Sequence, residues 1–331
     1  VQHERKRDRW TLRSGPFRED EFPPLGDRDW TLLVQDVDKW DMDVRALLAH
    51  FRFLPAWRMD DVMISFAVKG GSVGAHVDQY DVFLLQGLGH RRWQIDARPD
   101  PPLDFRPDVE LKLLREFTPS HDWVLGPGDM LYLPPGVPHH GVAEDHCLTL
   151  SFGMRAPSTS ELLVDFAEAL AELLPEESRY ADPDLQKPED AFEIDEAAMA
   201  RVKQALAALQ TDDATLRAWF GRFITRYRSA GDITPAARAP TIGKIDEALT
   251  AGGCLLRHPF ARFAWTRDGR RAQLFAHGEV RSMGVRSAAR LAAAERIDVD
   301  TWASLDGAGK EALAQLTELG HYQLQVPRRR R

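Results

Sequence analysis

The chain has 331 residues, 44% of them hydrophobic, which is enough to bury the cores of two or three domains. Its 51 acidic residues outnumber its 43 basic residues, and the formal net charge of −8 argues against an electrostatic footprint for nucleic acid over the whole chain. We therefore expect no direct binding to nucleic acid, whereas a basic protein partner fits an acidic surface.

Several features predict a cytoplasmic location. No run approaches the roughly 20 apolar residues of a membrane span, so we expect no membrane partner. The first residues, VQHERKRDRW, are charged and lack the apolar core of a signal peptide. Cys147 and Cys254 lie far apart in apolar surroundings, which is typical of reduced core residues in a reducing compartment.

Residues 1–156 have the pattern of a β-rich domain. Short apolar runs alternate with Gly, Pro and Asp, and a Gly-Pro-Gly-Asp turn signal occupies residues 126–129. The predicted strands are Val62–Val68, Val82–Gln86, Arg92–Ile95, Met130–Leu133 and Cys147–Phe152, and a helical segment is predicted at Asp43–Phe51. Short strands separated by turns predict a sandwich or a barrel.

Residues 157–232 change to helical spacing. Ser158 and Glu161 form a capping box ahead of LLVDFAEALAELL, whose apolar residues recur at helical intervals. A proline-containing connector at 175–188 precedes two further amphipathic segments, Ile194–Leu209 and Ala214–Tyr227. This region is predicted to be a helical domain.

Residues 240–331 combine helices with a small hairpin. The predicted helices are Thr241–Thr250, Ser287–Ala294 and Gly309–Leu319, and the predicted strands are Cys254–Arg257, Phe260–Thr266 and Ala272–Ala276. Asp268-Gly269 is the expected hairpin turn. This arrangement predicts a winged-helix-like domain, followed by a solvated charged tail at Arg328–Arg331.

The most informative residues are a histidine and an aspartate two positions apart. In a strand, His76 and Asp78 would point to the same face and could bind one ion together. A neighbouring strand would supply the third ligand, His139, from the segment Gly128–His139. Two histidines and one carboxylate form the ligand set of non-haem iron(II) oxygenases. The glycine, proline and histidine spacing of both segments also resembles the two motifs of the cupin superfamily, which place their histidines on facing strands.

His140 is the competing third ligand. The cupin spacing selects His139, and the adjacent side chain would point to the opposite face of an extended backbone. The remaining histidines lack comparable spacing and are interpreted as surface or core residues.

An iron oxygenase of this type must also bind 2-oxoglutarate. Arg91 lies on the strand that follows the turn Gly87-Leu-Gly89, and its guanidinium can bind the far carboxylate through two parallel hydrogen bonds. Arg92 and His90 are expected to face outward. Ser65 is a candidate for a second hydrogen bond to that carboxylate, or simply a strand hydroxyl with its own partner.

Longer stretches resemble the bacterial ribosomal oxygenases, which are JmjC-type enzymes. The resemblance lies in FLPAWRMDDVMISFAVKGGSVGAHVDQYDVFLLQGLGHRRWQI and LGPGDMLYLPPGVPHHG, continues through FGMRAPSTSELLVDFA and is weaker in AWFGRFITRYRS. Enzymes of this family hydroxylate an arginine of the large-subunit ribosomal protein L-sixteen. Two positions depart from the family pattern, since His140 stands where an acidic residue is common and His90 where arginine is common.

The resemblance implies an α+β protein: a double-stranded β-helix (cupin/JmjC) barrel at 1–156, a helical dimerisation domain at 157–232 and a winged helix at 240–331. It implies iron(II) held by His76, Asp78 and His139, with 2-oxoglutarate at Arg91 and O2 as the oxidant. The implied product is 3-hydroxyarginine in a ribosomal protein, with succinate and CO2. Gln79, Tyr80 and Asp81 are candidate substrate contacts, since a carboxylate is the natural partner of a guanidinium. Asp81 could equally cap a strand end.

Two other functions remain open at this point. One is a metal-dependent cupin enzyme that does not use 2-oxoglutarate, which the cation at position 91 argues against. The other is a non-catalytic nucleic-acid-binding protein, which the net acidity and the lack of a basic recognition helix in 286–320 argue against.

Overall fold

The computed structural model describes residues 1–183, 194–207, 212–226 and 233–326. It divides into two compact units, Val1–Ala156 and Pro157–Arg331, which are described separately below. The predicted tail Arg328–Arg331, part of the connector 175–188 and the predicted boundary at 232 lie outside the described residues. The division of the second unit into two domains stays a prediction.

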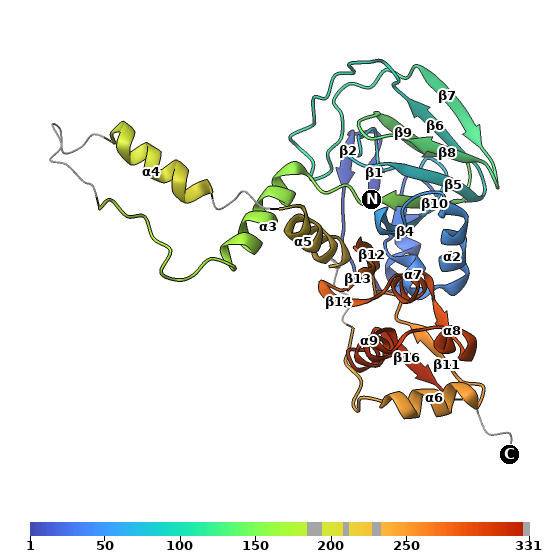
Figure 1. Ribbon diagram of the computed structural model, residues 1–331. Coiled ribbons are helices and arrows are strands. Elements are labelled where there is room, and N and C mark those ends of the chain that lie inside the picture. The colour runs from blue at the N-terminus through green and yellow to red at the C-terminus, as the bar shows by residue number, and fades with distance from the viewer. Residues whose placement is uncertain (184–193, 208–211, 227–232, 327–331) are drawn as a thin grey trace. The chain divides into compact units, whose positions relative to one another are not determined.

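The first unit is a barrel of two facing antiparallel sheets (Figure 1). The larger sheet has the order β3-β4-β10-β5-β8, with β3 at Thr31–Val34, β4 at Met59–Ala67, β10 at Cys147–Met154, β5 at Val82–Leu88 and β8 at Met130–Leu133. The smaller sheet has the order β7-β6-β9, with β7 at His121–Leu125, β6 at Arg91–Ile95 and β9 at His139–Ala143. All five predicted strands of this unit are confirmed, with each end within three residues of the predicted one.

Short helices cover the outer face of the larger sheet. They are α1 at Val37–Trp40, α2 at Met42–Leu47 and 3-10 turns at Leu48–Phe51 and Ala56–Arg58. The Asp41 side chain accepts hydrogen bonds from two backbone amides of α2 and so fixes its start. Phe51 then packs against Val62 and Phe152 of the sheet, which buries the outer face. The predicted helix Asp43–Phe51 is therefore an α-helix that tightens in its last turn.

An N-terminal hairpin adds a small two-stranded sheet to this unit. It comprises β1 at Gln2–Glu4 and β2 at Arg9–Thr11, neither of which the sequence predicted. Further 3-10 turns lie at Glu19–Glu21 and Pro23–Leu25.

The inner face of the barrel carries an unusual number of polar residues. Ser65 of β4 lies opposite Thr149 of β10, which in turn lies opposite Gln86 of β5, and all three are buried. Residues directly opposite in an antiparallel pair share a face, so this row points into the barrel. Apolar residues of β5, β6 and β8 pack beside the row, namely Val82, Leu84, Trp93 and Leu133.

Among the described residues, the second unit begins with three α-helices. They are α3 at Thr159–Ala171, α4 at Glu196–Leu206 and α5 at Asp213–Thr225, and each of them overlaps one predicted helical segment. The predicted capping box is confirmed, because Ser158 Oγ accepts from the Glu161 amide and the Glu161 carboxylate accepts from the Ser158 amide.

The rest of the second unit surrounds one apolar core. Its helices are α6 at Ile242–Thr250, α7 at Val285–Ala293, α8 at Val299–Ala303 and α9 at Gly307–Glu318. One sheet has the order β15-β11-β16, with β15 at Arg296–Ile297, β11 at Cys254–Arg257 and β16 at Tyr322–Gln325. The other has the order β12-β13-β14, with β12 at Phe263–Asp268, β13 at Arg271–Ala276 and β14 at Glu279–Gly284.

Most elements predicted for this region are confirmed, and β11 has the predicted bounds. Four were missed, β14, β15, β16 and α8, because they are short or lack a clear period. Helix α5, predicted to belong to a separate helical domain, packs its Gly221 against the Phe275 ring of β13. None of the described helices is both long and apolar enough to cross a membrane.

Candidate metal centre and cosubstrate pocket

Three predicted ligands come together at one end of the barrel. The nearest ligand atoms of His76, Asp78 and His139 all lie within 4.8 Å of one another. His139 starts β9, whereas His76 and Asp78 lie in an extended loop and not in the predicted strand. Only one pair continues the ladder there: the amides of His76 and His139 each donate to the other's carbonyl, at 3.0 and 2.9 Å. That single bridge brings the two residues side by side, and the centroids of their imidazole rings lie 4.2 Å apart.

Backbone hydrogen bonds fix which ring nitrogen is free. His76 Nδ1 donates to the Gly74 carbonyl at 3.0 Å, and His139 Nδ1 donates to the Val137 carbonyl at 2.9 Å. Because a carbonyl can only accept, the proton of each neutral ring is on Nδ1 and the lone pair is on Nε2. His139 Nε2 lies 3.7 Å from Asp78 Oδ2. Such outer hydrogen bonds orient metal-binding histidines in known sites.

The protonation states also suit a metal. Burial lowers the pKa of His139 to about 3, so the ring is neutral at physiological pH and available as a ligand. Burial raises the pKa of Asp78, which His76 and a hydrogen bond from Tyr80 oppose. A bound dication would keep this carboxylate ionised.

His140 is not part of this group. It lies opposite Gln94 on the other face of β9, and its ring packs edge-on against Phe117 with centroids 6.1 Å apart. Among the described residues, the three that can share an ion are His76, Asp78 and His139. The geometry therefore agrees with the choice of His139 over His140.

Arg91 lies deep in the same barrel. Arg91 is 5% exposed, and its Nη2 lies 3.6 Å from Cys147 Sγ on the opposite sheet. Its guanidinium carbon is 5.7 Å from the ring centroid of Trp93, and its Nε has no hydrogen-bond partner among the described residues. No carboxylate of the described residues pairs with it. A buried cation without an anion is costly, so this position favours binding of an anion.

The metal ligand His139 and the cation Arg91 lie at different levels along the barrel. His139 lies opposite Ile95, and Arg91 is four residues further along β6, opposite Ala143. At about 3.3 Å per residue this is roughly 13 Å between backbone positions, and both side chains reach inward across that gap. A separation of this order suits a five-carbon dicarboxylate held at both ends.

Ser65 lies on the same inner face, but its hydroxyl already has a backbone contact. Ser65 Oγ is 3.5 Å from the Thr149 carbonyl. Thr149 Oγ1 donates to Gln86 Oε1 at 2.9 Å, and Gln86 Nε2 donates to the Leu88 carbonyl at 2.8 Å. Gln86 thus links Thr149 on the inner face of the barrel to the turn that precedes Arg91. The sequence could have placed Gln86 on the inner face, because it lies two residues after the apolar Leu84 on β5. A role for Ser65 toward the cosubstrate stays a prediction.

The predicted substrate contacts directly follow Asp78 in the chain. Gln79 and Tyr80 are exposed, and burial of the hydroxyl beside Asp78 raises the pKa of Tyr80 above its usual value. Asp81 is already occupied, because Arg58 Nη2 donates to one oxygen at 3.0 Å and the Tyr132 hydroxyl donates to the other at 2.7 Å. Direct binding of a guanidinium by Asp81 would have to displace these two partners.

A different carboxylate, Asp61, was missed by sequence reasoning. It lies on β4 four residues before Ser65 and therefore on the same inner face, next to Gly153 of β10. Its Oδ2 accepts from the Asp36 amide at 3.1 Å, and no described cation donates to it. Burial raises the pKa of Asp61 to about 6. The sequence could have shown this, because every second residue before Ser65 on the same strand faces the same side.

The comparisons with known proteins agree with this geometry. The JmjC domain family matches residues 46–162, and the ROXA-like winged helix family matches residues 208–323. An Escherichia coli protein named ribosomal protein uL16 3-hydroxylase is 37% identical over 249 residues, which span 75% of this chain and 66% of that protein, just under two thirds. A crystal structure of E. coli YcfD is 32% identical, with a TM-score of 0.84, and the alignment covers 98% of this chain and 86% of that one.

This chain belongs to the JmjC-type ribosomal oxygenases. A further structure of this family, E. coli YcfD in complex with cobalt and 2-oxoglutarate, has a TM-score of 0.79 and 32% identity, and covers 98% of this chain and 85% of that chain. The predicted fold is thus confirmed: a JmjC/cupin barrel with a winged helix. The winged-helix match includes α5 and so starts well before residue 240.

Proposed function

We propose that this ribosomal oxygenase is an iron(II)- and 2-oxoglutarate-dependent hydroxylase acting on an arginyl residue of a large-subunit ribosomal protein. One observation carries the proposal: three clustered candidate metal ligands lie on the same inner face of one barrel as Arg91, which is buried and pairs with no carboxylate of the described residues. A cupin enzyme without 2-oxoglutarate would have no use for that arginine. The uL16 3-hydroxylase and the complex of YcfD with cobalt and 2-oxoglutarate support the same assignment.

The residues present fit both groups. His76, Asp78 and His139 would hold iron(II) on one face and leave three positions open. Arg91 would hold the far carboxylate of 2-oxoglutarate, and the metal would hold its keto acid end. When bound, iron(II), 2-oxoglutarate and O2 together supply the oxidising chemistry that hydroxylates an unactivated carbon and yields succinate and CO2. The chain's own contribution is to orient these groups and to exclude water from a largely buried chamber.

Asp61 is the carboxylate that best suits the substrate guanidinium. It accepts no hydrogen bond from a described cation, although the charge of Lys39 is near enough to lower its pKa, and it lies close enough to Tyr80 to raise the pKa of that hydroxyl. Ionised Asp61 would bind the arginine side chain through charge-assisted hydrogen bonds. Tyr80, between Asp61 and Asp78, would line the path to the metal.

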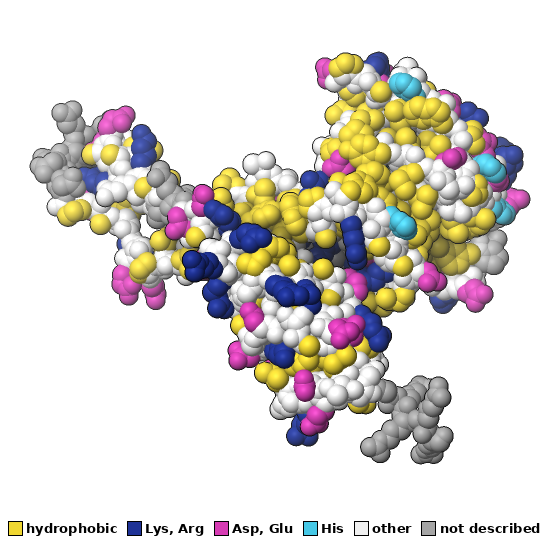
Figure 2. Space-filling model, turned by 45° about the vertical axis from the view of Figure 1, so that its right-hand side comes forward, with side chains coloured by type: hydrophobic (Ala, Val, Ile, Leu, Met, Phe, Trp, Pro, Cys, Tyr) yellow, Lys and Arg dark blue, Asp and Glu magenta, His cyan; other side chains and the backbone are white. Residues whose placement is uncertain are grey.

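A protein substrate also needs a docking surface. Hydrophobic side chains cover much of the visible face of the barrel unit (Figure 2). Exposed aromatic and methionine side chains lie around Tyr132, which donates to Asp81: Phe53 is 70% exposed, Tyr132 48% and Met130 47%. These residues would contact the segments of the ribosomal protein that flank the target arginine.

We further propose a homodimer formed through the helical region. Leu163 and Val164 of α3 are 65% and 57% exposed, and Leu206 of α4 is 57% exposed. Apolar helix faces of this kind are normally covered by a partner. Sedimentation of the wild type and of Leu163→Glu/Val164→Glu at micromolar concentration tests this, because the proposal requires a dimer that the substitutions dissociate. A cytoplasmic location follows from a ribosomal protein substrate.

The test of function uses the full chain, iron(II) and 2-oxoglutarate with purified ribosomal proteins of the host. We expect succinate formation and the mass of one added oxygen on an arginine of a single protein. His139→Ala should produce neither. Succinate formation without any modified arginine would contradict the substrate, whereas no metal binding and no succinate under any condition would contradict the enzyme class.

A further inference from the structure

Two segments far apart in the sequence hold the loop that leads into His76. The N-terminal hairpin contributes Arg5, whose Nη2 donates to the Gly70 carbonyl at 3.1 Å, and Trp10, whose ring lies against Gly74. The segment 103–115 contributes the Leu114 amide, which donates to the Ala75 carbonyl at 2.9 Å. The loop is therefore fixed from two sides.

Gly74 is the point where these segments meet. A Cβ on Gly74 would lie 2.8 Å from Leu113 Cδ2 and 3.3 Å from Trp10 Cη2, and its φ of +83° is one that favours glycine. Gly74 also presents the carbonyl that accepts from His76 Nδ1. The position of Gly74 between Trp10 and Leu113 thus determines where the imidazole of His76 points.

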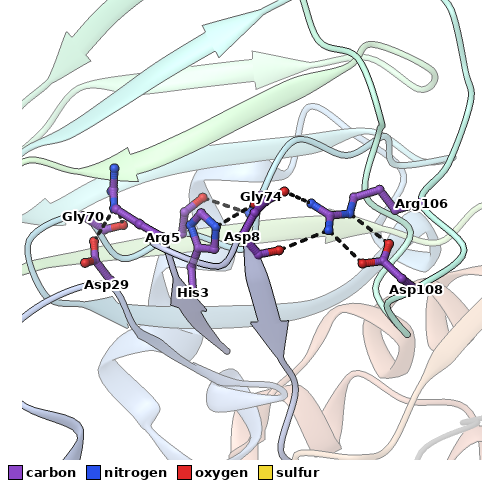
Figure 3. Close-up of polar contacts among 9 residues, drawn as sticks. His3, Arg5, Asp8, Asp29, Gly70, Gly74, Arg106 and Asp108 are labelled. Atoms are coloured by element: carbon purple, nitrogen blue, oxygen red, sulfur yellow. Dashed lines mark hydrogen bonds and ion pairs between the residues drawn. The ribbon is translucent and has the colours of Figure 1, made fainter.

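Arg106 ties the two segments together (Figure 3). Its amide donates to the Leu113 carbonyl at 2.8 Å, while its Nη1 donates to Asp8 Oδ2 at 2.6 Å and its Nη2 to the Asp8 carbonyl at 3.1 Å. Asp8 lies two residues before Trp10. The other side of the guanidinium binds both oxygens of Asp108, at 3.1 and 2.8 Å.

The hairpin side of this contact is itself ordered by a histidine. His3 Nε2 is 3.0 Å from Asp8 Oδ1, and its ring stacks on Trp10 with centroids 4.0 Å apart. Hydrogen bonds from His3 and Arg106 lower the pKa of Asp8, so the carboxylate is ionised when it pairs with Arg106. The guanidinium of Arg106 is mostly covered, with its side chain 19% exposed.

We propose that Arg106 is a positioning residue for the metal centre: it clamps Trp10 and Leu113 onto Gly74 and so holds His76 in its metal-binding orientation. The inference rests on the metal site proposed above. Loss of an interaction that orients a metal ligand typically weakens metal binding 10- to 100-fold. Arg106 acts through one more layer of contacts, so we expect about a 3- to 10-fold weakening, below the range for direct partners.

Arg92 offers a matched control. Like Arg106 it bridges two carboxylates, with Nε 2.7 Å from Glu144 Oε1 and Nη1 3.0 Å from Asp122 Oδ1. It lies on the outer face of β6, and its two carboxylate partners belong to neither the loop 70–75 nor the metal ligands. Arg92→Gln therefore measures the effect of removing an arginine that bridges two carboxylates but lies away from the loop.

The experiment titrates the metal-free full-length protein with cobalt(II), whose visible absorption reports the ligand geometry. Arg106→Gln should raise the dissociation constant about 3- to 10-fold and broaden the absorption, whereas Arg92→Gln should match the wild type. Hydrogen exchange of the metal-free protein should accelerate in peptides covering 72–78 in Arg106→Gln alone. Excess iron(II) should restore kcat, and the KM for 2-oxoglutarate should stay unchanged.

Equal cobalt affinity and equal exchange in Arg106→Gln and Arg92→Gln would overturn the inference. If Arg106→Gln does not fold, Arg106→Lys and Asp8→Asn replace it, and wild-type cobalt binding in both would overturn the inference equally. A wild type that binds no cobalt would contradict the proposed function itself, and the inference with it. Normal cobalt binding by the wild type separates the two failures.

Discussion

The barrel and the C-terminal body, which is the part of the second unit from α6 to β16, bury different kinds of residue. In the described part of the C-terminal body, one apolar cluster joins helices and both sheets, from Ile245 to Tyr322. In the barrel, the apolar clusters are smaller and separate, and buried polar residues lie between them, among them Gln86, Arg91 and His139. Burying such groups costs free energy, and the proposed binding of ligands in the barrel interior explains why they are buried there. Substitutions should therefore impair function in one body and stability in the other.

The largest expected effect is at the metal ligands. His139→Ala removes one of three ligands, and turnover should fall to background, a loss of at least about 1000-fold. Because the side chain is a buried polar group in a chamber, the fold should survive its removal. Cobalt titration and a thermal unfolding curve measure both properties on one sample. An active His139→Ala enzyme would show that the metal is held elsewhere.

The next largest effect is at Arg91. Losing one partner of a buried charge-assisted pair costs about 2–5 kcal/mol, so Arg91→Met should raise the KM for 2-oxoglutarate roughly thirtyfold to several thousandfold. Arg91→Lys should lie between, since it keeps the charge but not the fork geometry. Cobalt affinity should stay the same. The neighbouring Arg92→Met, on the outer face, is the control, and an unchanged 2-oxoglutarate titration in Arg91→Met would place the anchor elsewhere.

In the C-terminal body the expected effect is on stability alone. Leu255 of β11 is fully buried, whereas the adjacent Leu256 is 38% exposed. Leu255→Ala should lower the free energy of unfolding of this unit by about 2–5 kcal/mol, and Leu256→Ala by much less. Denaturant unfolding with and without cobalt measures the change. A large loss of metal affinity in Leu255→Ala would contradict the view that this body contributes to stability and not to metal binding.

A smaller and pH-dependent effect is expected at Asp61. Its pKa is raised to about 6, so below that pH the carboxyl is neutral and loses its attraction for a guanidinium. The kcat/KM for the arginyl substrate should fall as the pH drops through about 6, because this ratio reports the free enzyme. Asp61→Asn should be about 10- to 100-fold less efficient and should lack that step, in line with the loss of a hydrogen bond to a charged group. A step that persists in Asp61→Asn would belong to another group.

The sequence predicted the ligand set better than the walls of the pocket. His76, Asp78 and His139 follow from short local spacings, and the structure brings them together although His76 lies in a loop. Asp61 and Gln86 were missed because their roles arise from strand pairing, which places β4, β10 and β5 side by side in an order that the sequence does not display. The hairpin β1–β2 was missed for a similar reason: its charged strands have no apolar alternation, and its contacts to Gly74 and Arg106 are long-range.

The smallest expected effect separates two adjacent histidines. His140 lies on the outer face of β9 beside Phe117, and burial lowers its pKa to about 4, so at neutral pH it is an uncharged ring in a covered position. His140→Ala removes neither a ligand nor a charge, and cobalt affinity and kcat should stay within about threefold of wild type, with a modest loss of stability from the cavity. The pair His139→Ala and His140→Ala thus compares equal substitutions one residue apart on opposite faces of one strand. An inactive His140→Ala that still binds cobalt normally would assign this ring a part in the reaction. An inactive His140→Ala that has lost cobalt binding, beside an active His139→Ala, would reverse the choice of the third ligand.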